Sequence, residues 1–254
     1  MIDAVPKSSP GEVGQLFRGA LRLVQPASGH RAGTDAVLLA AACPAGARRV
    51  VDLGCGVGTV GLRAAQITGG DVRLVDNSPE ILAFCAENIT LNGLGARVSA
   101  VAADCLAKGF PALETGLANW ADVVLTNPPF DDAATVRRSP DPLKAAAHVL
   151  TGALDDWARA ALKCLAPKGD LVMIHRADAL APILAALAGR FGGVRLRFVQ
   201  PRAGAPAHRL LVRAQKGSRA PLSVLPPLVL HGASGAFLDE AAALHEGSAA
   251  LSWG

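Results

Sequence analysis

The chain has 254 residues, of which 51% are hydrophobic and 18% charged, and its net charge is a modest +4. This composition is typical of a folded globular protein and excludes a long disordered chain. No apolar run approaches the roughly 18 residues of a membrane span, and the first residues lack the pattern of a secretion signal, so we expect a cytoplasmic protein outside the membrane.

Apolar runs typical of buried strands alternate with helical patterns along the chain. In chain order, the predicted strands are 48–53, 72–76, 96–104, 120–126, 171–175, 194–200 and 209–215. The predicted helices between them are 58–67, 80–91, 154–165 and 177–189. The helix at 80–91 has clear ends, because Ser78 supplies an N-cap, Pro79 a first-turn proline and Asn92-Gly93 a C-terminal stop. This alternation predicts an α/β fold with a doubly wound, mostly parallel seven-stranded sheet covered on both faces.

No repeat, low-complexity tract or Gly/Ser linker divides the chain. We therefore expect one main domain at 46–254, with residues 1–45 forming a short N-terminal cap packed on it. The proline-rich stretch 220–235 is expected to be an extended closing segment.

Cysteines and histidines give no sign of a metal site. The five cysteines form no CxxC pair, and the six histidines show no ligand spacing. We expect reduced thiols and no structural or catalytic metal.

Positive charge is concentrated near the C-terminal part of the chain, where no acidic residue lies between Asp178 and Asp239. The basic residues of this interval that fall within 190–219 are Arg190, Arg195, Arg197, Arg202, Arg209, Arg213, Lys216 and Arg219. Such a stretch indicates either a polyanion-binding surface or a solvated face whose arginines pair with acids elsewhere in the fold. Charge alone does not separate the two.

The stretch "VVDLGCGVGTVGL" at 50–62 places Gly54, Gly56 and Gly58 directly after a predicted strand, with Asp76 at the end of the next. Glycines allow a tight turn and the close approach of a ligand to the backbone, and the acid can accept hydrogen bonds from a ribose. The spacing is GxGxG, and there is no GxxxxGK[ST] sequence, so a pyrophosphate or triphosphate cradle is not obvious. S-adenosylmethionine, which has a ribose but no phosphate, fits better.

Other polar residues follow the ends of the predicted strands. Asp52 can receive the ammonium of the methionine part of this cofactor. Asp104 ends a third strand, where it either borders the ligand or only caps the next helix. Cys55 has no histidine or lysine partner nearby to activate it, so we interpret it as a small pocket-lining residue.

The sequence "NPPF" at 127–130 forms a rigid corner after a fourth strand. Proline restricts both its own φ and the preceding residue, so the Asn127 side chain and the Pro128 carbonyl are held in a nearly constant relation. Both oxygens are acceptors that can bind the two hydrogens of one planar amino group, with Pro129 stiffening the turn and Phe130 stacking on the ring that bears the amine. A turn that only ends a strand and buries a phenylalanine is the alternative.

Taken in order, "VVDLGCGVGTVGL", "LVDNSPE", "AAD" and "NPPF" resemble the class I S-adenosylmethionine-dependent methyltransferases that modify amino nitrogens, which have a Rossmann-like fold. The segments at 23–42, 139–149 and 227–244 are similar to bacterial tRNA (adenine-N6)-methyltransferases that act in the anticodon loop of a valine tRNA. The resemblance implies that Asn77 binds the cofactor beside Asp76. It also implies that Arg31, Gly33 and Thr34, within "HRAGTDA", line the methionine pocket. One departure is Phe130, where the family often has tyrosine.

The resemblance implies methylation of the N6 amine of an adenine in structured RNA, with tRNA as the expected partner, held by the basic 190–219 region of a monomeric protein. Three alternatives stay open: guanine-N2 methylation of ribosomal RNA, methylation of a protein glutamine amide, and an RNA-binding module that uses the cofactor without turnover.

Overall fold

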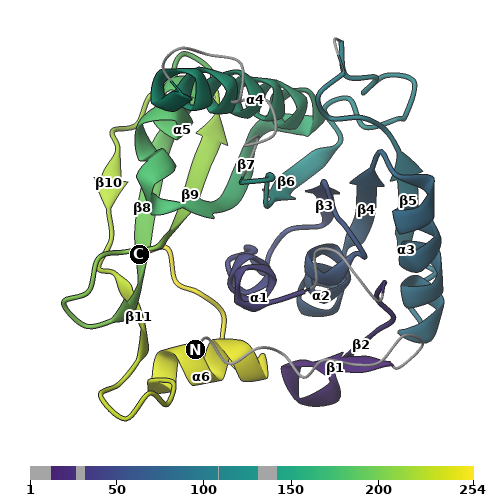
Figure 1. Ribbon diagram of the computed structural model, residues 1–254. Helices are drawn as coiled ribbons and strands as arrows, with labels where there is room; N and C mark the ends of the chain where they lie inside the picture. The colour runs from purple at the N-terminus through teal and green to yellow at the C-terminus, as the bar shows by residue number, and fades with distance from the viewer. Residues whose placement is uncertain (1–12, 27–31, 108, 131–141) are drawn as a thin grey trace.

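A twisted sheet forms the centre of the computed structural model, which describes residues 13–26, 32–107, 109–130 and 142–254 (Figure 1). The sheet has nine strands in the order β10-β8-β9-β7-β6-β3-β4-β5, with β11 beside β8. Its strands are β3 (Arg49–Leu53), β4 (Asp71–Asp76), β5 (Val98–Ala102), β6 (Ala121–Thr126), β7 (Leu165–Arg176), β8 (Phe191–Arg202), β9 (Arg209–Lys216), β10 (Ser223–Val224) and β11 (Leu228–His231). Strands β3 to β7 all run parallel to one another, and β9 runs antiparallel to both β7 and β8. The predicted seven-stranded, mostly parallel sheet is confirmed, and the short β10 and β11 extend it within the predicted closing segment.

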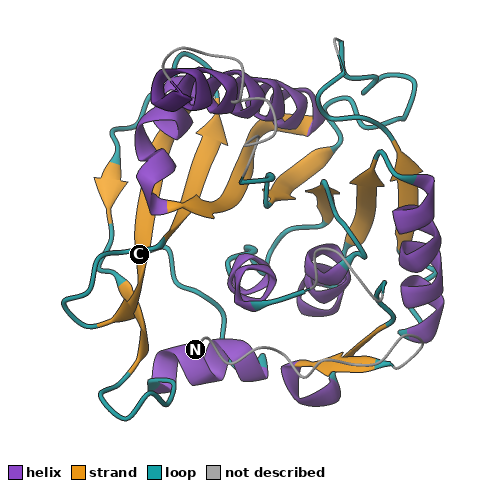
Figure 2. Cartoon of the chain, in the orientation of Figure 1, coloured by secondary structure: helices purple, strands orange, loops and turns teal. Residues whose placement is uncertain are grey.

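Helices cover both faces of the sheet (Figure 2). They are α1 (Thr34–Ala41), α2 (Thr59–Thr68), α3 (Pro79–Leu91), α4 (Pro142–Cys164), α5 (Leu180–Leu187) and α6 (Asp239–Glu246). Side chains alternate across the strands, so Val50 of β3 packs into the cluster that contains α1, α2 and α3, whereas Val51 packs into the cluster that contains α4 and α5. This division explains why the strands are apolar on both faces.

The ends of α3 form as the sequence indicates. The Ser78 hydroxyl accepts a hydrogen bond from the Ile81 N–H at 3.3 Å, and Pro79 is the first helical residue. The helix ends at Leu91, Asn92 is its C-cap, and Gly93 then takes a φ of +65°. The signals at both ends of this helix in the sequence therefore match its observed caps.

Most elements differ from their predicted bounds by a few residues, and α4 and β7 differ most. Helix α4 begins at Pro142, well before the expected start at 154. Strand β7 begins at Leu165 and takes in residues 166–170, which connect the predicted helix at 154–165 to the predicted strand at 171–175. Lys168 there has a φ of +65°, and the pairing with β6 shifts register between Ala121 and Val123. This connection is thus an irregularity within one strand, because β6 resumes its pairing on the other side of it.

The described part of the N-terminal segment packs on the same core as the sheet. Strands β1 (Gly14–Leu16) and β2 (Leu21–Leu23) form a hairpin, and buried Leu21 and Leu23 join the cluster around α2. The Asn88 amide donates to the carbonyls of both Val24 and Val57, each at 3.0 Å. This side chain ties the segment to the glycine-rich turn. The division into a cap at 1–45 and a domain at 46–254 stays a prediction.

In the part of the chain that the structure describes, no helix combines the length and apolar character needed to cross a membrane.

Candidate active site

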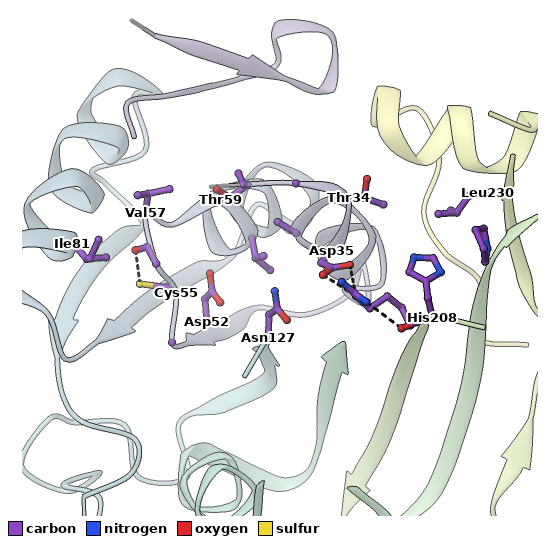
Figure 3. A pocket seen from close by; sticks show the side chains of 18 of the residues that line it. Thr34, Asp35, Asp52, Cys55, Val57, Thr59, Ile81, Asn127, His208 and Leu230 are labelled. Carbon is purple, nitrogen blue, oxygen red and sulfur yellow. Dashed lines mark hydrogen bonds and ion pairs between the residues drawn. The ribbon is translucent and has the colours of Figure 1, made fainter. Parts of the chain in front are cut away.

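Two cavities meet at the carboxyl ends of β3, β4 and β6. The larger has a volume of about 730 Å³ and the smaller about 530 Å³. Gly54, Gly56 and Asn127 line both cavities, so the glycine turn and the rigid corner form their shared wall. Figure 3 shows Asp52, Cys55 and Asn127 facing the larger cavity, across from Asp35 and His208. This is the edge of the sheet at which open α/β folds bind ligands.

A side chain would be unfavourable at each of the three glycines of the turn, but for different physical reasons. Gly54 has a φ of +71°, and a Cβ there would collide with the Trp157 ring of α4. Gly56 also has a positive φ, of +53°, but a Cβ there would meet no atom within 4 Å. Gly58 lines neither cavity; it precedes α2 with a φ of +89°, and a Cβ would lie 2.9 Å from Leu74. Gly56 therefore leaves open space for a ligand, whereas Gly54 and Gly58 serve packing.

Asp76 is held by the backbone around it. Its Oδ2 accepts from the Gly56 N–H and its Oδ1 from the Ser78 N–H, both at 3.1 Å. The carboxylate lines the smaller cavity together with Asn77 and Asp104. Each carboxylate oxygen has a further lone pair, so the group can accept hydrogen bonds from a ligand's hydroxyls.

Asp104 follows β5, and the next helix in the described chain, α4, begins only at Pro142, so Asp104 caps no helix. Its Oδ1 accepts from the Leu106 N–H at 2.9 Å, a local turn contact, and its side chain borders the smaller cavity.

Asp52 is 2% exposed at the end of β3, facing the larger cavity. Its Oδ2 accepts from the Gly61 N–H at 2.7 Å, and no cation among the described residues pairs with it. Burial raises the pKa of this carboxyl to about 7, with the Gly61 hydrogen bond opposing the rise and the nearby Asp76 adding to it. A ligand with an ammonium group would relieve this unfavourable burial.

The corner presents one unsatisfied acceptor. The buried Oδ1 of Asn127 has no hydrogen-bond partner among the described residues. Thr126, just before it, donates its hydroxyl to the Leu53 carbonyl at 2.9 Å, which joins the ends of β6 and β3. Pro128, Pro129 and Phe130 line the smaller cavity. An orphaned acceptor at a shared wall is the feature expected of a ligand contact.

Phe130 is held from two sides by residues that sequence analysis did not connect with it. The His175 ring meets it edge to face with a centroid distance of 4.8 Å, and the Arg209 guanidinium lies 4.9 Å from its centroid. Arg209 in turn pairs with Asp35 of α1 at 2.9 Å. Burial, then the charge of Arg176, lowers the pKa of His175 to about 4, so this ring is neutral at physiological pH. Asp35 and Arg209 are 174 positions apart, and no spacing pattern could have linked them.

Most of the predicted site residues come together. Those lining one or both cavities are Gly33, Thr34, Asp52, Gly54, Cys55, Gly56, Asp76, Asn77, Asp104, Asn127, Pro128, Pro129 and Phe130. Arg31 lies outside the described residues. The Cys55 thiol lies 3.7 Å from the Cys85 sulfur, and this contact together with burial raises its pKa, which suits a passive lining residue.

Most arginines of the basic stretch 190–219 pair with acids elsewhere in the fold, which was the second of the two interpretations of its charge. Its ion pairs within the described structure are Arg190–Asp155, Arg197–Glu240, Arg209–Asp35 and Arg213–Asp170. Arg195 and Lys216 donate to backbone carbonyls. Arg202 and Arg219 are exposed and make no ion pair or side-chain hydrogen bond with any described residue. Any polyanion surface thus depends on far fewer free charges than the sequence suggested.

A glycine turn after the first parallel strand, acids after the next two and an Asn-Pro-Pro corner after the fourth define a class I methyltransferase. The family model described as "Methyltransferase small domain" matches residues 31–199, and the chain belongs to this family.

Relatives agree with this assignment. A tRNA1(Val) (adenine(37)-N6)-methyltransferase of Aeromonas hydrophila is 30% identical over 216 residues, covering 82% of this chain and 86% of the relative. The ribosomal RNA large subunit methyltransferase G of Photobacterium profundum is 32% identical over 127 residues, covering 49% of this chain and 29% of that protein. The crystal structure of Atu636 from Agrobacterium tumefaciens, named a predicted O-methyltransferase, matches with a TM-score of 0.71 and 32% identity, over 85% of this chain and 98% of that one.

Proposed function

We propose that this protein transfers a methyl group from S-adenosylmethionine to the exocyclic N6 amine of an adenine in tRNA. The observation that carries the proposal is the buried, unpartnered Oδ1 of Asn127 at the wall between the two cavities. The adenine-N6 specificity in the name of the Aeromonas relative supports the same target atom. We also propose that the protein works as a monomer in the cytoplasm.

The described residues fit the cofactor. Asp76 would accept from the ribose hydroxyls, with Asn77 and Asp104 bordering the same cavity. Asp52 would hold the ammonium of the methionine part, and Gly33 and Thr34 would line that end. S-adenosylmethionine supplies an already electrophilic methyl group, so the protein has to position the acceptor and does not have to activate the donor.

The corner would orient the amine. Asn127 Oδ1 and the Pro128 carbonyl can accept its two hydrogens, which favours a pyramidal nitrogen whose lone pair is free to attack. Phe130, held by His175 and Arg209, would stack on the base and set the angle of approach. These contacts strengthen as the nitrogen becomes pyramidal, so they stabilise the transition state more than the bound substrate.

The chemistry of the corner disfavours a hydroxyl acceptor, whereas other amino groups remain competitors. The likeness to a ribosomal RNA methyltransferase, over about half of this chain, leaves ribosomal RNA as the second candidate substrate. The exocyclic amine of a guanine there would offer the corner the same two hydrogens. A glutamine amide offers the same two hydrogens. A hydroxyl acceptor, as in the name of the Agrobacterium protein, would gain nothing from a second acceptor oxygen.

The test uses purified protein, labelled S-adenosylmethionine and unmodified total tRNA, followed by nucleoside digestion and mass spectrometry. We expect N6-methyladenosine with the native protein. Asn127→Ala should lose about 2.7–4 kcal/mol of transition-state stabilisation, roughly 10²–10³ in rate, as for loss of one oxyanion-type contact. Calorimetric affinity for the cofactor should persist in this variant. N2-methylguanosine, or label in protein only, would contradict the proposed target, and a variant that still methylates at the native rate would remove Asn127 from the mechanism.

A further inference from the structure

The larger cavity extends beyond the residues suited to the cofactor. Its far end is formed by the end of β8, the start of β9 and the end of β11, and the residues there are Pro201, Arg202, His208, Leu230 and His231. Figure 3 shows His208 and Leu230 across the cavity from Asp52 and Asn127. These residues lie on the antiparallel and edge part of the sheet, away from the glycine turn.

The charge at this end is positive. Asp35 also lines the larger cavity, but its ion pair with Arg209 at 2.9 Å neutralises its negative charge. Arg202 is exposed, and no described acid or carbonyl accepts from its guanidinium. A free guanidinium on a cavity rim is suited to a phosphodiester oxygen.

The same end carries flat rings. His231 stacks on Phe237 with a centroid distance of 4.5 Å, and Phe237 stacks on His245 at 4.3 Å, so a column of three rings ends at the cavity. Burial lowers the pKa of both His208 and His245, which favours their neutral rings. The buried Nδ1 atoms of His208 and His231 have no hydrogen-bond partner among the described residues. Flat rings with unused polar edges suit a nucleobase, which both stacks and forms hydrogen bonds.

We propose that the far end of the larger cavity binds a nucleotide adjacent to the methylated adenine, with its base against His231 and His208 and its phosphate at Arg202. The inference rests on the proposed function, because a base that leaves its stack to reach the corner brings its neighbour to the same opening. Stacking and one phosphate contact would position the RNA, while the corner selects the reacting amine.

The test compares binding of an unmodified anticodon stem-loop of tRNA1(Val) with that of two stem-loops carrying an abasic residue on the 5′ or the 3′ side of the target adenine. His231→Ala should weaken binding of the intact stem-loop by about 5–100-fold, the range of one lost base stack, whereas His231→Phe should keep most of it. Arg202→Ala should weaken binding and reduce the slope of log K against log salt by about one. Arg219→Ala is the matched control, since Arg219 is also exposed but lines neither cavity.

The abasic RNAs decide the assignment. With one of them, His231→Ala should bind as the native protein does, because the base it would stack on is gone. Calorimetric affinity for S-adenosylmethionine should stay within twofold in every variant. An equal loss with intact and abasic RNAs, or an Arg202→Ala effect no larger than that of Arg219→Ala, would overturn the site; so would weaker cofactor binding with unchanged RNA binding. Should His231→Ala fail to fold, the comparison of Arg202→Ala with Arg219→Ala still decides. Product analysis of the native protein tests the proposed function separately, because the stacking measurement involves no turnover.

Discussion

At the scale of single residues, Asp52 has the clearest consequence, because a carboxyl with a pKa of about 7 is partly protonated at neutral pH. A ligand ammonium would favour its ionised form, so cofactor binding should release a proton. Below pH 7, where that ammonium stays charged, affinity should rise with pH by up to tenfold per unit. Calorimetry between pH 5.5 and 7, in buffers of different ionisation enthalpy, measures both quantities. Asp52→Asn should bind more weakly and lose the pH dependence; a native affinity that is flat over this range would contradict the assignment.

The Asp52 carboxyl should make the ligand-free protein less stable as the pH rises, whereas it makes cofactor binding tighter. Its folded pKa, about 7, lies above the roughly 3.9 of an unfolded aspartate, so its contribution is most favourable below pH 4 and is lost as pH rises through 7. Without ligand, Asp52→Asn should therefore raise the free energy of unfolding at pH 8, by about 1–3 kcal/mol, with the gain shrinking toward pH 5. Urea unfolding at both pH values tests this. A variant destabilised at pH 8 would show that the hydrogen bond to Gly61 outweighs burial.

At the scale of elements, the turn between β3 and α2 separates packing from ligand binding. Gly54→Ala should destabilise the protein by about 3 kcal/mol or more, because it combines a left-handed backbone with a collision against Trp157. Gly56→Ala should cost only about 1 kcal/mol, from its backbone alone, since a Cβ there meets nothing within 4 Å. Its methyl would instead occupy the ligand space and weaken cofactor binding. Thermal melting and calorimetry of the two variants distinguish these effects, and equal losses of stability would contradict them.

The elements also show what can be read from sequence. The strands, the caps of α3 and the acids at strand ends follow from local patterns, because each depends on residues within a few positions of one another. The irregularity in β7 depends on where β6 resumes pairing, and the support of Phe130 by His175 and Arg209 depends on strands meeting in three dimensions. Neither is encoded by periodicity. The basic stretch is the reverse case, since its charges are visible in sequence but their acid partners are not.

At the scale of the whole molecule, ion pairs attach the antiparallel strands to the parallel half, and one of them also reaches the site. Arg209 and Arg213 both lie on β9, and both pair with acids at similar side-chain exposure, 25% and 26%. Only Arg209 also covers Phe130.

The two arginines therefore form a matched pair for a final prediction. Arg209→Met and Arg213→Met should each reduce stability by about 1 kcal/mol, as expected for one partly exposed ion pair. Only Arg209→Met should also lower kcat for methyl transfer, by about tenfold, because Phe130 loses the cation on its ring and the base is held less rigidly. Cofactor affinity should not change in either variant. Urea unfolding and single-turnover kinetics measure the two effects, and an equal fall in kcat for both would mean that Arg209 acts only through the stability of β9.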